Sequence, residues 1–343
     1  MSDENKTLTP VWICYVDGKR LDTKHEGALK SITVRDRLNG IGQCEFLFDT
    51  SAEKLLELGD LVLGSEVSVH LGYKDDVEEV FNGVITTFAP QFKEFGHEMV
   101  EVICSNALSN LRHGNHYVTA ENKTYSEVIK EIIEKYSLNA DVDSFGPKLE
   151  YFDFDGETDY DFLQNYSKLY GKDFYAYADK IYVKDNIQIR DDEIIFEWGK
   201  SLIELEPRIN IENLFSEVNC IGWDPLKCSE IVGNAKIADL PIKVGGSNNW
   251  TQLIKGSENK FIHNIASIKF FDEEDAKNIA LGVLQKNSFL FITAAGTAEG
   301  TYKLLPGMRV NIKYSGSKFE GEYIAEKVTH IFDISSGYTT LFY

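Results

Sequence analysis

The pattern of hydrophobic positions divides the chain into three stretches. From about Val11 to Cys104, apolar and polar residues alternate with a period of two, in short runs separated by Gly, Asp and Asn. This alternation is typical of strands with one buried face, so it predicts a small antiparallel sheet or barrel. One short helix is expected at Ser51–Leu58, where Gly59 would end it. The predicted strands are VWICYV, SITVRD, QCEFLFD, SEVSVHLGY, FNGVITTFAP and EMVEVIC.

The middle stretch changes to a helical period. Thr124 and Glu127 form the capping-box pattern that opens a helix, and the apolar residues after them recur on one helical face. A second helix is expected to begin at Thr158 and to end at Gly171, and the residues DFYAYADKIYV that follow predict a hairpin. This is an α/β unit. Its predicted buried faces are Tyr125, Val128, Ile129, Ile132, Ile133 and Tyr136 in the first helix, and Phe162, Leu163, Tyr166, Leu169 and Tyr170 in the second.

The third stretch returns to strands from about Leu202. A loop-rich segment around GGSNN interrupts it, and Asp272 is expected to cap a third helix that buries Ala276, Ile279, Ala280, Val283 and Leu284. The chain closes with the strand-like runs FLFITAAG, RVNIKY, EGEYIAEKVTHIF and YTTLFY. We therefore predict three domains: a first β-barrel domain at 1–112, an α/β domain at 113–200 and a second β-barrel domain at 201–343.

One hairpin pattern occurs twice. LVLGSEVSVHLGYKDDVEEVFNGVI (61–85) and LLPGMRVNIKYSGSKFEGEY (304–323) each contain a glycine, an alternating strand, a polar turn and Phe-x-Gly. If the pattern is a true duplication, Gly64 should be equivalent to Gly307, and Gly83 to Gly321. Alternating hairpins are common, so chance competes with duplication as the explanation until other parts of the chain support it.

Composition and charge narrow the function classes. The 343 residues are 43% apolar, which is enough for two or three domains with their own cores. The 55 acidic residues outnumber the 35 basic ones, for a net charge of −20, and no basic patch favours sequence-specific nucleic-acid binding. No apolar run approaches the ~20 residues of a membrane span, and the start MSDENKTL does not resemble a signal peptide. We expect a soluble protein made in the cytoplasm, without stable membrane insertion.

Candidate catalytic and metal-binding residues do not form a recognisable set. His113 and His116 have a spacing that would suit a metal, but no Cys or Asp is near them, so a solvated turn is favoured. The acidic run from Asp153 to Asp161 lacks the spacing of a calcium loop, and Asp159 and Asp161 are expected to stabilise a helix N-terminus instead. Neither a P-loop, a dinucleotide fingerprint nor a Gly-x-Ser-x-Gly elbow occurs. We predict no enzymatic activity, no cofactor and no metal.

The histidines and cysteines are expected to be structural. His263 and His330 lie in strand-like runs and are predicted to be core or rim residues. The five cysteines are scattered without a C-x-x-C, so most should be buried as small hydrophobic residues in a reducing compartment. They are Cys14, Cys44, Cys104, Cys220 and Cys228.

Three stretches resemble the phage late control D family, which includes contractile-tail baseplate hubs and the hub part of VgrG-like proteins. They are DYDFLQNYSKLYGKDFYAYADKIYV, VNCIGWDPLKCSEIVGNA and the segment from Ala294 to Tyr343, and together they span the chain from about residue 158 to its end. The residues that carry the resemblance are predicted to be structural. They are Gly222, Trp223, Asp224, Pro225, Pro306, Gly307, Phe319 and Gly321.

The resemblance implies a fold and an assembly. The fold would be mainly β (α+β) and hub-like, with two tudor-like small β-barrels and an intervening α/β unit. Three chains would form a homotrimeric ring whose six similar barrels face the six-fold inner tube, while a threefold spike lies below. Implied partners are the inner tube protein ring, a trimeric spike protein, and tape-measure and LysM-type baseplate proteins. Because the sequence ends at Tyr343, we expect the spike to be a separate polypeptide.

Two other function classes stay open at the level of sequence. A tail-associated cell-wall hydrolase could use carboxylates on a hub scaffold, and a glycan-binding module could use exposed aromatic residues. If the chain is a baseplate hub, the sequence is compatible with four kinds of particle: a phage, a tailocin, a type VI secretion system and an extracellular injection system. The expected location is a phage virion or an injection-system particle.

Overall fold

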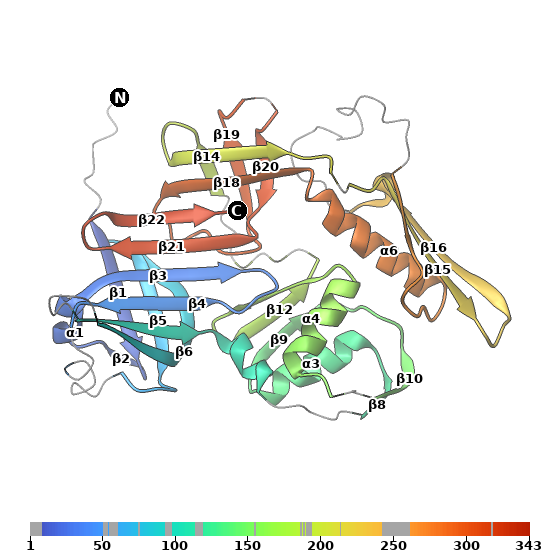
Figure 1. Cartoon of the computed structure of the whole chain (residues 1–343), viewed down its shortest axis with the longest axis horizontal. Helices are drawn as coiled ribbons and strands as arrows, with labels where there is room; N and C mark the ends of the chain where they lie inside the picture. The colour runs from blue at the N-terminus through green and yellow to red at the C-terminus, as the bar shows by residue number, and fades with distance from the viewer. Residues whose placement is uncertain are drawn as a thin grey trace.

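The structure is a computed structural model with a mainly β, α+β architecture (Figure 1), as the sequence predicts. It describes residues 9–343 except 51–53, 55–60, 75, 93–97, 114–118, 154–155, 186, 188, 190–193, 213, 242–260 and 317. The predicted helix at 51–58 and the GGSNN segment therefore lie outside the described residues, apart from Lys54.

One large sheet joins the two β regions of the chain. Among the described residues it has eleven strands, and its seam is the antiparallel pairing of β3 with β21, in which Thr33 lies opposite Ile331. In sheet order the strands are β14 (Leu202–Ile209), β18 (Ile292–Glu299), β22 (Gly337–Phe342), β21 (Lys327–Asp333), β3 (Leu29–Arg37), β4 (Gln43–Phe48), β7 (Glu98–Ser105), β6 (Asp76–Phe92), β5 (Glu66–Tyr73), β1 (Pro10–Val16) and β2 (Lys19–Arg20).

The N-terminal part of this sheet curls around its own core without closing. The Trp12 ring on β1 lies 6.4 Å from that of Phe332 on β21, and the Tyr73 ring lies 5.9 Å from that of Tyr338, so the far end of the sheet returns to the seam. Buried side chains such as Val69 fill the curl, and α1 (Thr23–Ala28) lies beside it (Figure 1). In the part of the chain that the structure describes, no sheet is a closed barrel.

The second β core lies between the other end of this sheet and a small sheet of three strands. β13 (Ile194–Glu197), β19 (Arg309–Lys313) and β20 (Gly321–Ile324) form the small sheet. Phe196 stacks on Phe342 across the core, with the ring centroids 5.1 Å apart. The two β regions thus keep separate cores, but they share β21 and β22 instead of closing separately. The shared seam covers strand edges that two separate open sheets would leave exposed.

The α/β unit has a third core, to which segments from both sides of β14 contribute. Helices α3 (Tyr125–Lys135) and α4 (Asp159–Leu169) pack with α6 (Glu273–Ser288) and with strands of two further sheets. Those sheets are β9 (Asn139–Val142), β11 (Asp173–Tyr177) and β12 (Lys180–Lys184), and β15 (Glu217–Asp224), β16 (Ser229–Lys236) and β17 (Ile262–Ile265). The remaining elements are β8 (Thr119–Lys123), β10 (Leu149–Asp153) and the 3-10 helices η2 (Ala107–Arg112) and η3 (Ile237–Asp239).

Local sequence signals explain the helix boundaries. Thr124 and Glu127 make both hydrogen bonds of the capping box at α3, and the Thr158 side chain accepts from the Asp161 N–H at α4. Gly171 ends α4 with a φ of +67° and lies against Gly282 of α6. A side chain at position 282 would begin 2.6 Å from the Tyr170 carbonyl carbon, so only glycine allows the two helices to approach this closely.

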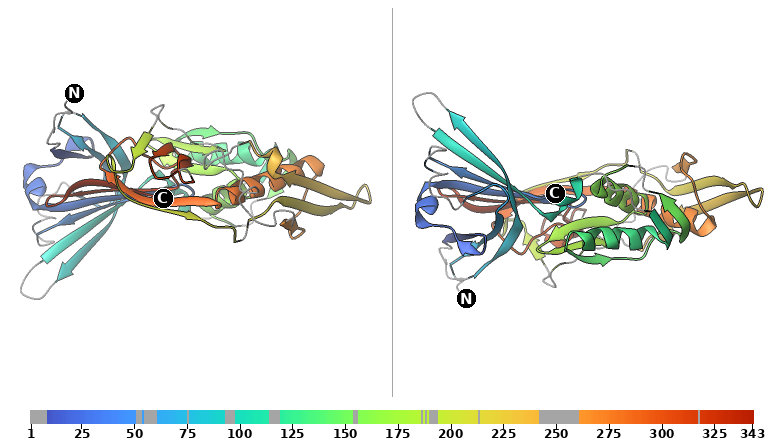
Figure 2. Two further views of the ribbon diagram at one scale, coloured as in Figure 1. Left: turned by 90° about the horizontal axis from the view of Figure 1, so that it is seen from above. Right: turned by 90° about the horizontal axis from the view of Figure 1, so that it is seen from below.

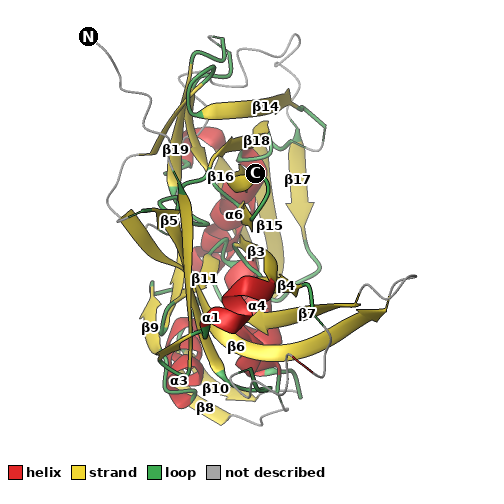
Figure 3. Cartoon of the chain, turned by 90° about the vertical axis from the view of Figure 1, so that its left-hand side faces the viewer, coloured by secondary structure: helices red, strands yellow, loops and turns green. Residues whose placement is uncertain are grey.

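Two hairpins project from opposite ends of the molecule. The β6–β7 hairpin extends past the curled sheet, and the β15–β16 hairpin extends past the N-terminal end of α6 (Figure 2). Figure 3 shows how far the β6–β7 ribbon stands away from the rest of the sheet. Because each ribbon has little of the molecule beside it, both are candidates for contacts with other chains.

Candidate functional site

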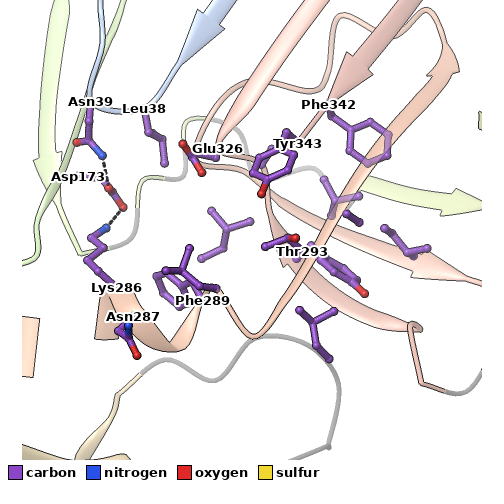
Figure 4. Close-up of a pocket in the computed structure, with 18 of the residues that line it drawn as sticks. Leu38, Asn39, Asp173, Lys286, Asn287, Phe289, Thr293, Glu326, Phe342 and Tyr343 are labelled. Atoms are coloured by element: carbon purple, nitrogen blue, oxygen red, sulfur yellow. Dashed lines mark hydrogen bonds and ion pairs between the residues drawn. The ribbon is translucent and has the colours of Figure 1, made fainter. Parts of the chain in front are cut away.

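An apolar cavity opens where the three cores meet (Figure 4). Its volume is about 490 Å³, which lies in the range of ligand and side-chain binding pockets. Walls come from the turn after β3, from α6 and the segment that follows it, and from strands of the second β core. The residues that give it its apolar character include Phe289, Leu290, Val310, Ile312, Phe342 and Tyr343.

A polar bridge borders this cavity and ties the turn after β3 to the α/β unit. Asn39, at the end of β3, donates from its side-chain amide to Asp173 of β11 over 2.7 Å, and the Lys286 ammonium of α6 pairs with the same carboxylate. The Asn39 backbone has a φ of +58°, and its side-chain oxygen accepts from the Phe174 N–H at 3.0 Å. The turn after β3 contributes one group and the α/β unit contributes two groups to this charge-assisted network.

The local sequence of α6 shapes the cavity floor. Asn287, in the last turn of α6, accepts the Phe215 N–H on its side-chain oxygen at 2.6 Å. This bond holds the loop before β15 against the end of α6, and Phe289 and Leu290, which follow the helix, line the cavity. Both lie in the strand-like run FLFITAAG, so no sequence pattern predicted a cavity there.

A buried carboxylate joins the large sheet to the α/β unit near this bridge. Asp36 of β3 accepts a hydrogen bond from the Tyr175 hydroxyl of β11 at 2.6 Å. Burial raises the pKa of Asp36 to about 7, although the Tyr175 hydrogen bond acts in the opposite direction. The Asp36 carboxyl and the side-chain amide of Asn106 both lie where a Cβ at Gly42 would stand, so only glycine fits at that position. The Asp36–Tyr175 pair therefore forms part of the interface between the large sheet and the α/β unit.

The predicted Gly222–Pro225 signature forms the tip of the projecting β15–β16 hairpin. Asp224 accepts the N–H groups of Leu226 and Lys227 at 2.9 and 3.1 Å, and this closes the turn. These bonds hold the pKa of Asp224 below its usual range. Trp223 is 61% exposed and Leu226 is 94% exposed, so the turn presents apolar side chains to solvent. Gly222 lies against the Phe270 ring, where a larger side chain would not fit.

The second signature group lies in the repeated hairpin. Gly64 and Gly307 have φ values of +89° and +87°, and their N–H groups donate to the carbonyls of Ile85, in β6, and Ala325, directly after β20, at 2.8 and 2.7 Å. The two glycines therefore have nearly the same φ, and each donates the same kind of backbone hydrogen bond across its hairpin. Pro306 precedes Gly307, and the Phe319 carbonyl accepts the Tyr323 hydroxyl at 2.8 Å.

The predicted equivalence of Gly83 and Gly321 is wrong by two residues. Gly83 lies opposite Val67, whereas Gly321 lies opposite Ile312. Counted from the preceding glycine, the position that matches Gly83 is Tyr323, which lies opposite Val310. A shift of two residues keeps every side chain on the same face of a strand, so the alternating pattern could not distinguish the two registers.

The remaining candidates have structural surroundings. His330 is buried and its Nδ1 lies 2.9 Å from the Tyr338 hydroxyl, and His263 stacks on Phe215. His113 is exposed, and His116 and Asp155 lie outside the described residues. Asp159 accepts from the Tyr136 hydroxyl at 2.7 Å in the first turn of α4. Four cysteines are buried and Cys228 is exposed. No group of three potential metal ligands occurs within the described ranges.

One protein family matches almost the whole chain. Residues 6–333 match the family described as the Alg8 N-terminal domain. The chain belongs to this family. No curated protein matches the sequence. The matched residues include segments of all three cores.

Solved structures similar to this chain include phage-type tail proteins. A 43 kDa tail protein of prophage MuSo2 from Shewanella oneidensis has a TM-score of 0.70 at 12% identity, with 97% of each chain covered. A tail protein from Neisseria meningitidis MC58 has a TM-score of 0.67 at 13% identity, covering 97% of this chain and 95% of its own. A type VI secretion system component from Escherichia coli has a TM-score of 0.58 at 12% identity, covering 92% and 72%.

At these identities the likeness establishes the fold, which the Alg8 N-terminal domain shares with phage tail proteins. The expected resemblance to tail proteins is confirmed at that level, and the narrower late control D assignment stays a prediction. Among the described residues, none of the helices has the length and apolar character needed to cross a membrane.

Proposed function

We propose that this chain is a structural, non-enzymatic baseplate hub of a contractile phage tail or a tail-like injection system. The observation that carries the proposal is the repeated hairpin, in which Gly64 and Gly307 share one backbone conformation and one ladder contact, each beside its own β core. Three chains with two such units present six similar units around one axis. A ring of this kind adapts a six-fold tube to a threefold spike.

The fold supports this role and the charge is compatible with it. Tail proteins of similar fold cover almost the full length of the chain. The net charge of −20 per chain disfavours stable contact with nucleic acid, so DNA or acidic cargo would pass a trimeric ring without being retained. In this role the protein is made in the bacterial cytoplasm and ends in a virion or an injection-system particle.

The test is co-expression with the neighbouring tube and spike genes, followed by mass measurement and particle imaging. We expect three copies on the axis between tube and spike. A stable dimer, or a particle that lacks the chain at this position, would overturn the proposal.

The non-enzymatic part has a separate test. Purified protein should release no soluble fragments from peptidoglycan. Turnover that disappears when one or two carboxylates are changed to amides would instead identify a tail-associated hydrolase. A reproducible glycan-array signal that depends on an exposed aromatic residue would identify a glycan-binding module.

A further inference from the structure

The β15–β16 hairpin carries an apolar patch that the protomer leaves uncovered. Ile221, Trp223 and Val232 lie on the face opposite Gly222, because alternate residues of a strand share a face and Ile221 pairs with Val232. Leu226 extends this surface into the turn. We name these four residues the tip patch. Isolated exposed apolar residues are ordinary, but a group at the end of a projecting hairpin is typical of an interaction site.

The apolar cavity is the complementary feature. Its walls include Phe289 and Leu290, which follow the C-terminal end of α6, whereas the β15–β16 hairpin extends past the N-terminal end of that helix (Figure 1). Gly233 of the hairpin lies against Ala276 in the first turn of α6, and Asn287 at the cavity is eleven residues further along the helix. At 1.5 Å per residue this is about 16 Å, and the hairpin tip projects beyond it. The tip patch therefore does not fill the cavity of its own chain.

Ring symmetry gives these two surfaces a common use. Each contact in a three-membered ring joins two different patches, one from each neighbour. The protomer offers an apolar projection at one end and an apolar cavity away from it. Lys227 at the tip pairs with Asp224 of its own chain, and Glu326 at the cavity pairs with Lys327, so the contact would depend on apolar burial.

We propose that the hairpin of one protomer inserts Trp223 and Leu226 into the apolar cavity of the next protomer. This inference rests on the proposed function, because it requires the ring. Burial of an indole and an isobutyl group would anchor the contact in the way that buried aromatic residues anchor other interfaces. The Asn39–Asp173–Lys286 bridge would keep the cavity walls in place before the neighbour arrives.

Cysteine cross-linking tests the contact directly. Cys228 is exposed at the tip, and Cys14, Cys44, Cys104 and Cys220 are buried. In a Glu326→Cys variant co-expressed with tube and spike, mild oxidation should link Cys228 of one chain to position 326 of the next. A disulfide needs Cα atoms within about 7 Å, so the distance along α6 excludes this link within one chain.

Matched variants show whether the cross-link reports the proposed contact. Leu226→Ser and the cavity-filling Thr293→Trp should each lower the linked fraction at least tenfold. Phe92→Ser, on the other projecting hairpin, should leave it unchanged, and Cys228→Ser in the Glu326→Cys chain should remove it. Circular dichroism melting curves verify that each variant is folded.

Each outcome has one meaning. Trimers that carry the linkage between Cys228 and position 326 support the inference. Trimers without it overturn the inference and leave the proposed function standing. A link from position 326 to the tube or spike protein overturns it and assigns the cavity to that partner. Absence of trimers in the presence of both partners overturns the inference and the proposed function together.

Discussion

The buried Asp36 carboxyl should make the junction between the large sheet and the α/β unit sensitive to pH. Burial raises the pKa of Asp36 from 3.8 to about 7. Below pH 4 the side chain is protonated in both the folded and the unfolded protein, so it does not alter stability. Between pH 4 and pH 7 only the folded protein keeps the proton, and the free energy of unfolding falls as pH rises.

The size of the effect follows from the shift. One pKa unit corresponds to 1.36 kcal/mol, so a shift of about three units lowers the free energy of unfolding by about 4 kcal/mol at pH 8 relative to pH 4. Asp36→Asn replaces the carboxyl by a neutral amide whose oxygen can still accept the Tyr175 hydrogen bond. The variant should therefore be more stable than the parent by up to about 4 kcal/mol at pH 8, with almost no advantage at pH 4.

Urea denaturation at half-unit pH steps measures this difference. The curves of parent and Asp36→Asn should converge toward pH 4 and separate up to pH 7. Tyr175→Phe is the control, because it leaves the titrating carboxyl in place but removes a hydrogen bond that lowers its pKa, so its curve should show a pH dependence at least as large as that of the parent. If Asp36→Asn destabilises the protein equally at pH 5 and pH 8, the carboxylate is a stabilising acceptor and the reasoning is wrong.

Three further predictions concern glycine positions and one helix cap. Gly282→Val should destabilise the protein by about 1–3 kcal/mol in thermal denaturation, because its side chain would overlap the backbone at the end of α4. Gly307→Ala should be more destabilising than Gly64→Ala, since both have positive φ values but only the first would meet Ile187, at 2.8 Å; equal losses would contradict this. Thr124→Ala should cost about 1 kcal/mol through loss of the α3 cap, and an unchanged melting temperature would show that the cap is dispensable.

The sequence predicted local structure well because local structure depends on local signals. The capping box at Thr124, the stop at Gly171 and the N-cap at Asp272 each act within one helical turn, and the structure has all three. The mainly β class followed from the period-two alternation for the same reason.

Long-range features could not be predicted in this way. The pairing of β3 with β21 joins segments whose patterns fit many partners equally well, so two separate barrels and one shared sheet have the same alternation. The apolar cavity draws its walls from distant segments, and no short motif marks it. The tip of the β15–β16 hairpin did leave a signal, because Trp223 and Leu226 beside a Pro turn are unusual in a solvated loop.

The β3–β21 seam also has a consequence for how the protein is made. Thr33 pairs with Ile331, so β3 leaves the ribosome long before its partner strand exists. At 5–20 residues per second, synthesis of the roughly 300 intervening residues takes about 15 to 60 seconds. During that time one edge of β3 is open to pairing with another nascent chain. Truncation before β21 would make this exposure permanent, so the last strands of the chain protect the first ones from aggregation.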